Sequence, residues 1–209
     1  MTSFPASLAQ RTRASHSESE GAGFMSDLLR GRGSAEDYVA LSAQHWFVYT
    51  ALERVVDRLS GDPVLATLHH DGLIRVPAIE ADLAELIGPD WRSEIAPLPV
   101  TKEYVARIEE VADWTGGVIA HHYTRYLGDL SGGQYIAKAM RRAYGIDKGL
   151  AFYDFAELGD LTAFKDGYRA ALDEAPWDES ERERVVDEVL LAYDFNTRLF
   201  DELAEDAAA

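Results

Sequence analysis

Helix start and stop signals recur along the chain and constrain its fold more than any other feature. Residues 34–37 form a capping-box pattern and open a run whose apolar positions repeat every three or four residues. Pro77 begins a second such run, which stops at Gly88. A third and longer run over residues 118–144 stops at Gly145, a residue type typical of helix ends.

Strand signals are missing from the same sequence. No alternating apolar pattern lies between Asn-Gly or Asp-Gly turns, and there is no internal repeat or low-complexity linker. With 47% apolar and 11% aromatic residues, the chain can build a sizeable core. We therefore predict one all-α, multi-helix domain over residues 1–209, with loose termini at 1–7 and 205–209.

Composition excludes several classes of function. The chain has no cysteine, so disulfides, thiolate metal sites and cysteine nucleophiles are ruled out. A formal charge of −17 argues against nucleic acid or an anionic membrane surface as the main partner. No stretch approaches the roughly 20 apolar residues that span a bilayer, and the N-terminus lacks the apolar core of a secretory signal. A cytoplasmic protein without a membrane partner is expected.

One segment of this acidic chain is basic. Lys138, Arg141 and Arg142 lie close together within residues 125–142, where Asp129 is the only acid. Such a patch predicts a bound anion or an acidic partner, and ordinary solvated helix charge is the alternative.

Residues 130–134, LSGGQ, spell the signature pentapeptide of ABC-type ATPases. That signature works only beside a phosphate-binding loop of the form G-x-x-x-x-G-K-[ST]. The chain contains no Gly-Lys pair and no alternation of strands and helices. The match is therefore coincidental.

The glycines of this segment still require an explanation. Gly128, Gly132 and Gly133 lie within one predicted helix, where each costs about 1 kcal/mol relative to alanine. Gly128 and Gly132 are four residues apart and share a face, and Arg125 and Asp129 occupy the adjoining stripe. Close helix–helix packing would explain two glycines. We favour a bound ligand, because packing has little need for a third glycine or for a carboxylate beside them.

A candidate metal ligand lies near the N-terminus. His16 is followed four residues later by Glu20, on the same helical face, and a carboxylate is the usual partner of a metal-bound histidine. An exposed pair on a helix surface is the alternative. Adjacent histidines at 69–70 and 121–122 diverge by about 100° on a helix, and His45 lies on an apolar stripe that is typical of a core histidine.

Residues 121–134, HHYTRYLGDLSGGQ, resemble the distal-helix signature of the heme oxygenases almost letter for letter. Residues 16–31 resemble the proximal histidine region of that family, and residues 46–53 (WFVYTALE) resemble its second helix. FKDGYR at 164–169 and NTRLFDEL at 196–203 resemble its C-terminal helices. The resemblance implies an all-α fold with heme b held between a proximal helix and a kinked distal helix.

The resemblance also implies residue roles. His16 is the axial ligand of the heme iron and Glu20 its hydrogen-bond partner. Gly128 and Gly132 let the distal helix approach the macrocycle, and Asp129 anchors a proton-delivering water network with Arg125 and Tyr49. The remaining implied heme contacts are Gly133, the propionate-binding Tyr123, Lys165 and Arg169, and Asn196 and Phe200 on the last helix.

One position departs from the family pattern. Members often carry a lysine seven residues before the proximal histidine, where this chain has Ala9. Arg11 or Arg13 is a candidate substitute, and the meso carbon that is cleaved is left open for that reason.

The implied activity is cleavage of heme to biliverdin, carbon monoxide and ferrous iron, with O₂ and an external reductant. A ferredoxin or a flavin reductase is the expected electron donor, the basic patch is its candidate docking surface, and a monomer is expected. The biological role, iron acquisition or production of pigment or carbon monoxide, is left open. A heme-storage or heme-sensing protein is the main alternative, and a helical enzyme acting without heme is the other. No membrane-anchoring tail is expected after Ala209.

Overall fold

The computed structural model describes residues 2–21 and 23–208, except for the side chain of Glu20. Every regular element in this part of the chain is helical, so the predicted all-α fold is confirmed. The elements are α1 (Phe4–Gly21), α2 (Gly23–Leu29), α3 (Ala35–Arg58), α4 (Leu65–Leu68), η1 (Asp71–Leu73), α5 (Val76–Leu86), η2 (Trp91–Ser93), α6 (Pro99–Glu110), α7 (Thr115–His122), η3 (Tyr123–Leu127), α8 (Gly128–Tyr144), η4 (Ala151–Tyr153), η5 (Ala156–Leu158), α9 (Leu161–Asp173) and α10 (Glu179–Ala207).

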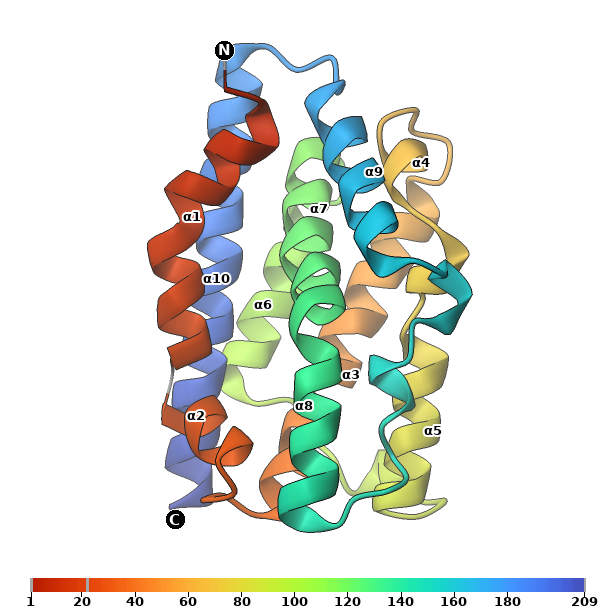
Figure 1. The fold of residues 1–209 in the computed structure, drawn as a ribbon, viewed down its shortest axis with the longest axis vertical. Coiled ribbons are helices and arrows are strands. Elements are labelled where there is room, and N and C mark those ends of the chain that lie inside the picture. The colour runs from red at the N-terminus through yellow and green to blue at the C-terminus, as the bar shows by residue number, and fades with distance from the viewer. Residues whose placement is uncertain (1, 22, 209) are drawn as a thin grey trace.

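The long helices lie roughly along one direction (Figure 1). The first and last helices, α1 and α10, pack side by side along one edge of the molecule, and α10 also packs on α6 and α7. The run formed by α7, η3 and α8 passes through the middle of the view, and α3 packs against α5 and α6. The fold thus brings the N-terminal helix α1 and the central run with its glycines, which are about 100 residues apart in the sequence, into one bundle.

Local sequence signals explain where several of these helices begin and end. Ser34 caps α3 through a complete capping box, because its hydroxyl accepts from the Asp37 amide at 3.1 Å and the Asp37 carboxylate accepts from the Ser34 amide at 2.7 Å. Gly145 ends α8 in the left-handed conformation, with φ of 66°, which glycine adopts without a steric penalty. The predicted stop at Gly145 is confirmed.

The predicted run over residues 118–144 is helical throughout, but not as one regular α-helix. Residues Tyr123–Leu127 form a π-helical turn between α7 and α8. Such turns insert extra backbone into an α-helix and are frequent at functional sites. Here the π turn comes directly before Gly128 and Asp129, so it sets the direction in which α8 presents them.

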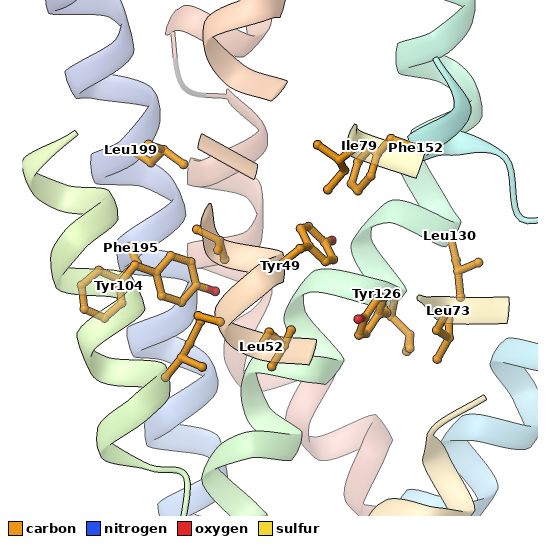
Figure 2. Packing of buried hydrophobic residues seen from close by; sticks show 14 of the residues in the cluster. Tyr49, Leu52, Leu73, Ile79, Tyr104, Tyr126, Leu130, Phe152, Phe195 and Leu199 are labelled. Atoms are coloured by element: carbon orange, nitrogen blue, oxygen red, sulfur yellow. The ribbon is translucent and has the colours of Figure 1, made fainter. Parts of the chain in front are cut away.

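The core lies beside this central run. Tyr49, Leu52, Tyr104, Tyr126 and Phe195 are among its buried side chains (Figure 2). Tyr104 stacks on Phe195 with ring centroids 4.8 Å apart, and Tyr49 meets Tyr126 edge to face at 5.5 Å. Packed aromatic rings therefore join α6 to α10 and α3 to the π turn.

The loose termini expected at residues 1–7 and 205–209 stay a prediction, and the described residues near each end of the chain are mostly helical. Phe4 lies in α1 with 5% of its surface exposed, and its ring meets Trp177 edge to face at 5.9 Å. Its amide donates to the Asp173 carboxylate at 2.6 Å. At the other terminus α10 continues to Ala207. A single aromatic residue close to the N-terminus anchors the first turn, which composition alone did not indicate.

Within the described ranges, no helix combines the length and apolar character needed to cross a bilayer.

Candidate active site

A cavity of about 380 Å³ lies between α1, α2, α8 and α10. Seven of the predicted site residues line it: His16, Arg125, Gly128, Asp129, Gly132, Asn196 and Phe200. They come from α1, the π turn, α8 and α10, which are far apart in the sequence. The fold therefore brings the predicted distal and proximal residues to one place.

Gly128 and Gly132 present bare backbone to open space. A Cβ atom built on either glycine meets no atom within 4 Å apart from its chain neighbours and the backbone of its own helix. No neighbouring helix packs on this face, so close helix–helix packing does not explain the pair. The two glycines instead leave a flat surface along one side of the cavity.

Gly133 has a different role from its neighbours. A Cβ atom at this position would lie 2.8 Å from Cδ1 of Tyr153. Gly133 is buried and is absent from the lining of the cavity. Its expected contact with a cofactor stays a prediction, and in the described part of the chain this third glycine allows close packing of the Tyr153 ring.

Asp129 is the carboxylate that lines the cavity in the described part of the chain, and its surroundings control its protonation. Burial raises the pKa of Asp129 to about 6, although the Arg125 charge and a hydrogen bond from Tyr49 oppose the shift. The Tyr49 hydroxyl donates directly to Oδ2 of Asp129. A group with this pKa can exist in both protonation states near neutral pH.

Arg125 is held in place beside this carboxylate. Its Nη1 donates to Oδ1 of Asn196 at 2.8 Å, and its guanidinium lies 5.0 Å from the centroid of the Tyr49 ring. Its Nε is buried and has no hydrogen-bond partner in the described part of the molecule. A buried, fixed cation beside Asp129 and an unused donor are suited to an ordered polar network.

His16 lies on α1, on a different helix from the glycine surface. The side chain is half-buried, lines the cavity and meets the Tyr193 ring edge to face at 5.6 Å. The backbone of Glu20 lies in α1, but its side chain is outside the described part, so the predicted hydrogen bond to His16 stays a prediction.

A smaller, polar cavity of about 230 Å³ shares His16, Gly128 and Tyr193 with the first. Of the three predicted propionate-binding residues, Tyr123 and Arg169 line it. Lys165, the third, lies with its Nζ 3.4 Å from Oγ of Ser131, which also lines the cavity. The predicted anion-binding side chains thus gather at one end of the site.

The structure also separates the two candidate substitutes for a lysine at Ala9. Arg13 and Ala9 both line the polar cavity. Arg11 instead forms a two-pronged ion pair with Glu183, with N–O distances of 2.5 and 2.8 Å. Of the two candidates, Arg13 is therefore the one placed to replace the lysine at this end of the site, beside Arg169.

Sequence reasoning missed several lining residues. Met25 and Leu29 of α2, Tyr153 of η4, and Tyr135 and Ile136 of α8 all line the larger cavity. Extending the helical stripe from Gly128 and Gly132 by one turn would have found Tyr135 and Ile136. His45 is buried, as predicted for a core histidine, but it also borders the cavity.

These residues fit an iron-bearing flat ring. The open glycine surface offers space for the ring, His16 offers an imidazole nitrogen from another helix, and the polar end offers cations for carboxylate substituents. Fold and site together define a class of protein: an all-helical protein whose cavity suits a planar, anionic ring that carries a metal ion.

Comparison with known proteins identifies the family. The family model described as heme oxygenase matches residues 2–202. Heme oxygenase 1 of Synechocystis sp. is 38% identical over 198 residues, covering 94% of this chain and 82% of its own. Human heme oxygenase 1 is 35% identical over 203 residues, covering 95% and 70%. The chain belongs to the heme oxygenase family.

Solved structures agree with this assignment. The crystal structure of the Synechocystis heme oxygenase-1 in complex with heme matches with a TM-score of 0.94 at 36% identity, covering 99% of this chain and 95% of that one. The heme oxygenase of Leptospira interrogans matches with a TM-score of 0.91 at 30% identity, covering 96% and 100%. The fold predicted from the resemblance is confirmed.

Proposed function

We propose that this protein is a heme oxygenase that cleaves heme b at a meso carbon to biliverdin, carbon monoxide and ferrous iron. The observation that carries the proposal is the open glycine surface beside Asp129, a carboxylate with a pKa of about 6 that Tyr49 contacts. Heme storage or sensing would need His16 and the cationic end of the site. It would not need a titrating carboxylate at a bare backbone surface, so the enzyme is favoured.

The substrate would lie between α1 and α8. His16 would ligate the iron, and the surface at Gly128 and Gly132 would receive the face of the ring. The propionates would meet Tyr123, Lys165 and Arg169 at the polar end. Arg13 would take the place of the lysine that family members often carry at the position of Ala9.

Bound heme would supply the site for O₂ and the carbon that is oxidised. The protein would supply orientation and protons. Asp129 would pass protons from solvent into the cavity through ordered water, because its pKa lets it gain and lose a proton near neutral pH. Tyr49 would hold the carboxylate, and Asn196 would hold Arg125 beside it.

Electrons would come from an external protein donor, a ferredoxin or a flavin reductase. Lys138, Arg141 and Arg142 are exposed on the C-terminal half of α8, and no ion pair joins them to a carboxylate in the described part of the chain. They would form the docking surface for an acidic donor. We further propose that the protein acts as a monomer in the cytoplasm.

Two measurements test the proposal. Hemin titration should give a Soret band that shifts in the wild type, and the His16→Ala variant should lose that shift. Reduction of the hemin complex in air, by ascorbate or a reductase, should then give biliverdin. Asp129→Ala should bind hemin but lose biliverdin formation, and formation at the wild-type rate would exclude Asp129 as the proton relay.

A further inference from the structure

Tyr135 is the large hydrophobic side chain that the described part of the molecule leaves exposed, with 62% of its surface accessible. It lies in the middle of α8 and lines the larger cavity. Its exposure is not required by the helix, because a smaller or polar residue would serve equally well on a solvated face. An aromatic ring at the mouth of a cavity has apolar surface available for a ligand.

The ring is directed to the cavity by its helical position. Gly128, Gly132, Tyr135 and Ile136 follow one another at spacings that place them on a single stripe of α8. Side chains in a helix lean toward its N-terminus and cover the preceding turn. For Tyr135 that turn contains Gly132, whose missing side chain leaves room for the ring beside the glycine surface.

Tyr135 lies at the apolar end of the site. Tyr123 lines only the smaller, polar cavity, whereas Tyr135 lines only the larger one and lies roughly 10 Å beyond Gly128 along the helix axis at 1.5 Å per residue. In this direction α8 approaches α2, since the Tyr144 hydroxyl donates to the Leu28 carbonyl at 2.7 Å. Met25 and Leu29 of α2 line the same cavity as Tyr135.

We propose that Tyr135 closes the site over bound heme: its ring packs on the hydrocarbon edge of the macrocycle, opposite the propionates, and retains the substrate. The inference rests on the proposed function, because it requires the propionates at the polar end. The ring then exchanges its solvated surface for contact with an apolar, aromatic edge, which stabilises the complex through burial and ring–ring contact.

A competing role for the same side chain is docking of the electron donor. Lys138 and Arg142 share the stripe of Tyr135 at the next two turns of α8. An aromatic residue bordered by cations is also common at protein interfaces. Heme contact is favoured because Tyr135 lines the cavity itself, whereas neither Lys138 nor Arg142 does.

The first test is the rate at which hemin leaves the protein, measured by transfer to excess apomyoglobin. Loss of the ring in Tyr135→Ala should speed release about tenfold. Tyr135→Phe keeps the ring and serves as the matched control, with a rate within about twofold of the wild type. Release from Tyr135→Ala at the wild-type rate would overturn the proposal.

The second test uses the exposure of the side chain. Tyr135 is the exposed tyrosine of the described chain, so tetranitromethane should nitrate it readily in the apoprotein, as mapped by mass spectrometry. Redox-inert gallium protoporphyrin IX should lower this nitration about fivefold. It should leave the partly buried Tyr144, on the same helix and outside the cavity lining, unchanged.

Equal nitration of Tyr135 with and without the porphyrin would contradict heme contact. Protection by an added donor protein, but not by the porphyrin, would assign Tyr135 to docking instead. Failure of this inference is distinguishable from failure of the proposed function. In the former case wild type still binds hemin and forms biliverdin, and in the latter it forms no biliverdin, whether or not it binds hemin.

Discussion

Burying the Asp129 carboxylate costs the fold stability, and the same burial gives the group a pKa suited to proton transfer. Its folded-state pKa of about 6 lies above the ordinary value of 3.8, because burial penalises the charged form. The folded protein therefore binds a proton more tightly than the unfolded chain does. Stability falls as the pH rises from about 4 to about 6 and stays lower above that range.

Replacing Asp129 by asparagine should therefore stabilise the apoprotein while abolishing turnover. The neutral amide avoids the burial cost, so we expect a gain of about 2 kcal/mol in the free energy of unfolding at pH 7. The gain should shrink as the pH falls toward 4, where Asp129 is itself neutral. Urea unfolding at several pH values measures this, and a gain that does not vary with pH would contradict the raised pKa.

Helix α8 combines two kinds of glycine at neighbouring positions. Gly132 faces open space, whereas Gly133 faces the Tyr153 ring. The sequence pattern does not distinguish the two positions, because they are consecutive glycines in one helix. Only the packing of η4 against α8 distinguishes them.

The two glycines should respond oppositely to alanine. Gly132→Ala should stabilise the apoprotein by up to about 1 kcal/mol through helix propensity, and should weaken hemin binding about tenfold by blocking the ring. Gly133→Ala should destabilise by roughly 1–3 kcal/mol, because its Cβ atom would lie 2.8 Å from the Tyr153 ring. Thermal unfolding and hemin titration of both variants provide the comparison. Equal destabilisation by both would argue against an open glycine surface.

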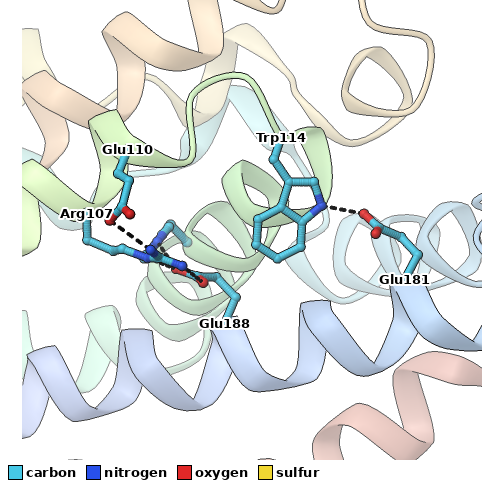
Figure 3. A network of polar contacts seen from close by, with 6 residues as sticks. Arg107, Glu110, Trp114, Glu181 and Glu188 are labelled. Atoms are coloured by element: carbon cyan, nitrogen blue, oxygen red, sulfur yellow. Dashed lines mark hydrogen bonds and ion pairs between the residues drawn. The ribbon is translucent and has the colours of Figure 1, made fainter.

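At the scale of the whole molecule, a buried polar network joins three helices (Figure 3). Glu188 of α10 accepts from Arg107 of α6 at 2.6 and 2.9 Å and from His121 of α7 at 2.9 Å. Burial alone would raise the pKa of Glu188, but the hydrogen bonds from His121 and Arg107 lower it to about 2. A lowered carboxyl pKa contributes stability at neutral pH, and this stability is lost as the pH falls from about 4.5 toward 2.

Glu188→Gln should consequently destabilise the fold by about 3 kcal/mol at pH 7, because it removes the buried carboxylate that Arg107 and His121 share. The difference from wild type should narrow at pH 3, because Glu188 of the unfolded chain is then protonated while the folded protein still holds it charged. Denaturant unfolding at the two pH values measures this. Glu110→Gln, at an exposed carboxylate of the same arginine, is the control and should cost less than about 1 kcal/mol.

The basic patch gives a prediction about the protein in its complex with a donor. Reversing two charges in Lys138→Glu/Arg142→Glu should raise the KM for a ferredoxin or flavin reductase about tenfold at low ionic strength. Turnover driven by ascorbate should be unchanged, because the small reductant needs no docking surface. Unchanged reductase-supported turnover would show that the basic patch is not the docking surface for the electron donor.

Much of this organisation could be predicted from the sequence, but not all of it. The helices follow from local signals at Ser34 and Gly145, and the glycine face at 128 and 132 follows from helical spacing. The contact of Tyr49 with Asp129 joins α3 to α8, so the resemblance implied it but local pattern could not. The π turn and the role of Gly133 depend on how α8 packs, and no pattern in the segment itself carried them.

The central claim is that this cavity converts heme to biliverdin with the help of Asp129. Single turnover of the wild-type hemin complex with a reductase in air tests it most directly, with the product identified by absorbance and chromatography. We predict loss of the Soret band and appearance of a biliverdin isomer in the wild type, and no biliverdin from Asp129→Ala. A wild-type complex that binds hemin and stays unchanged, or forms no bilin, would contradict the claim.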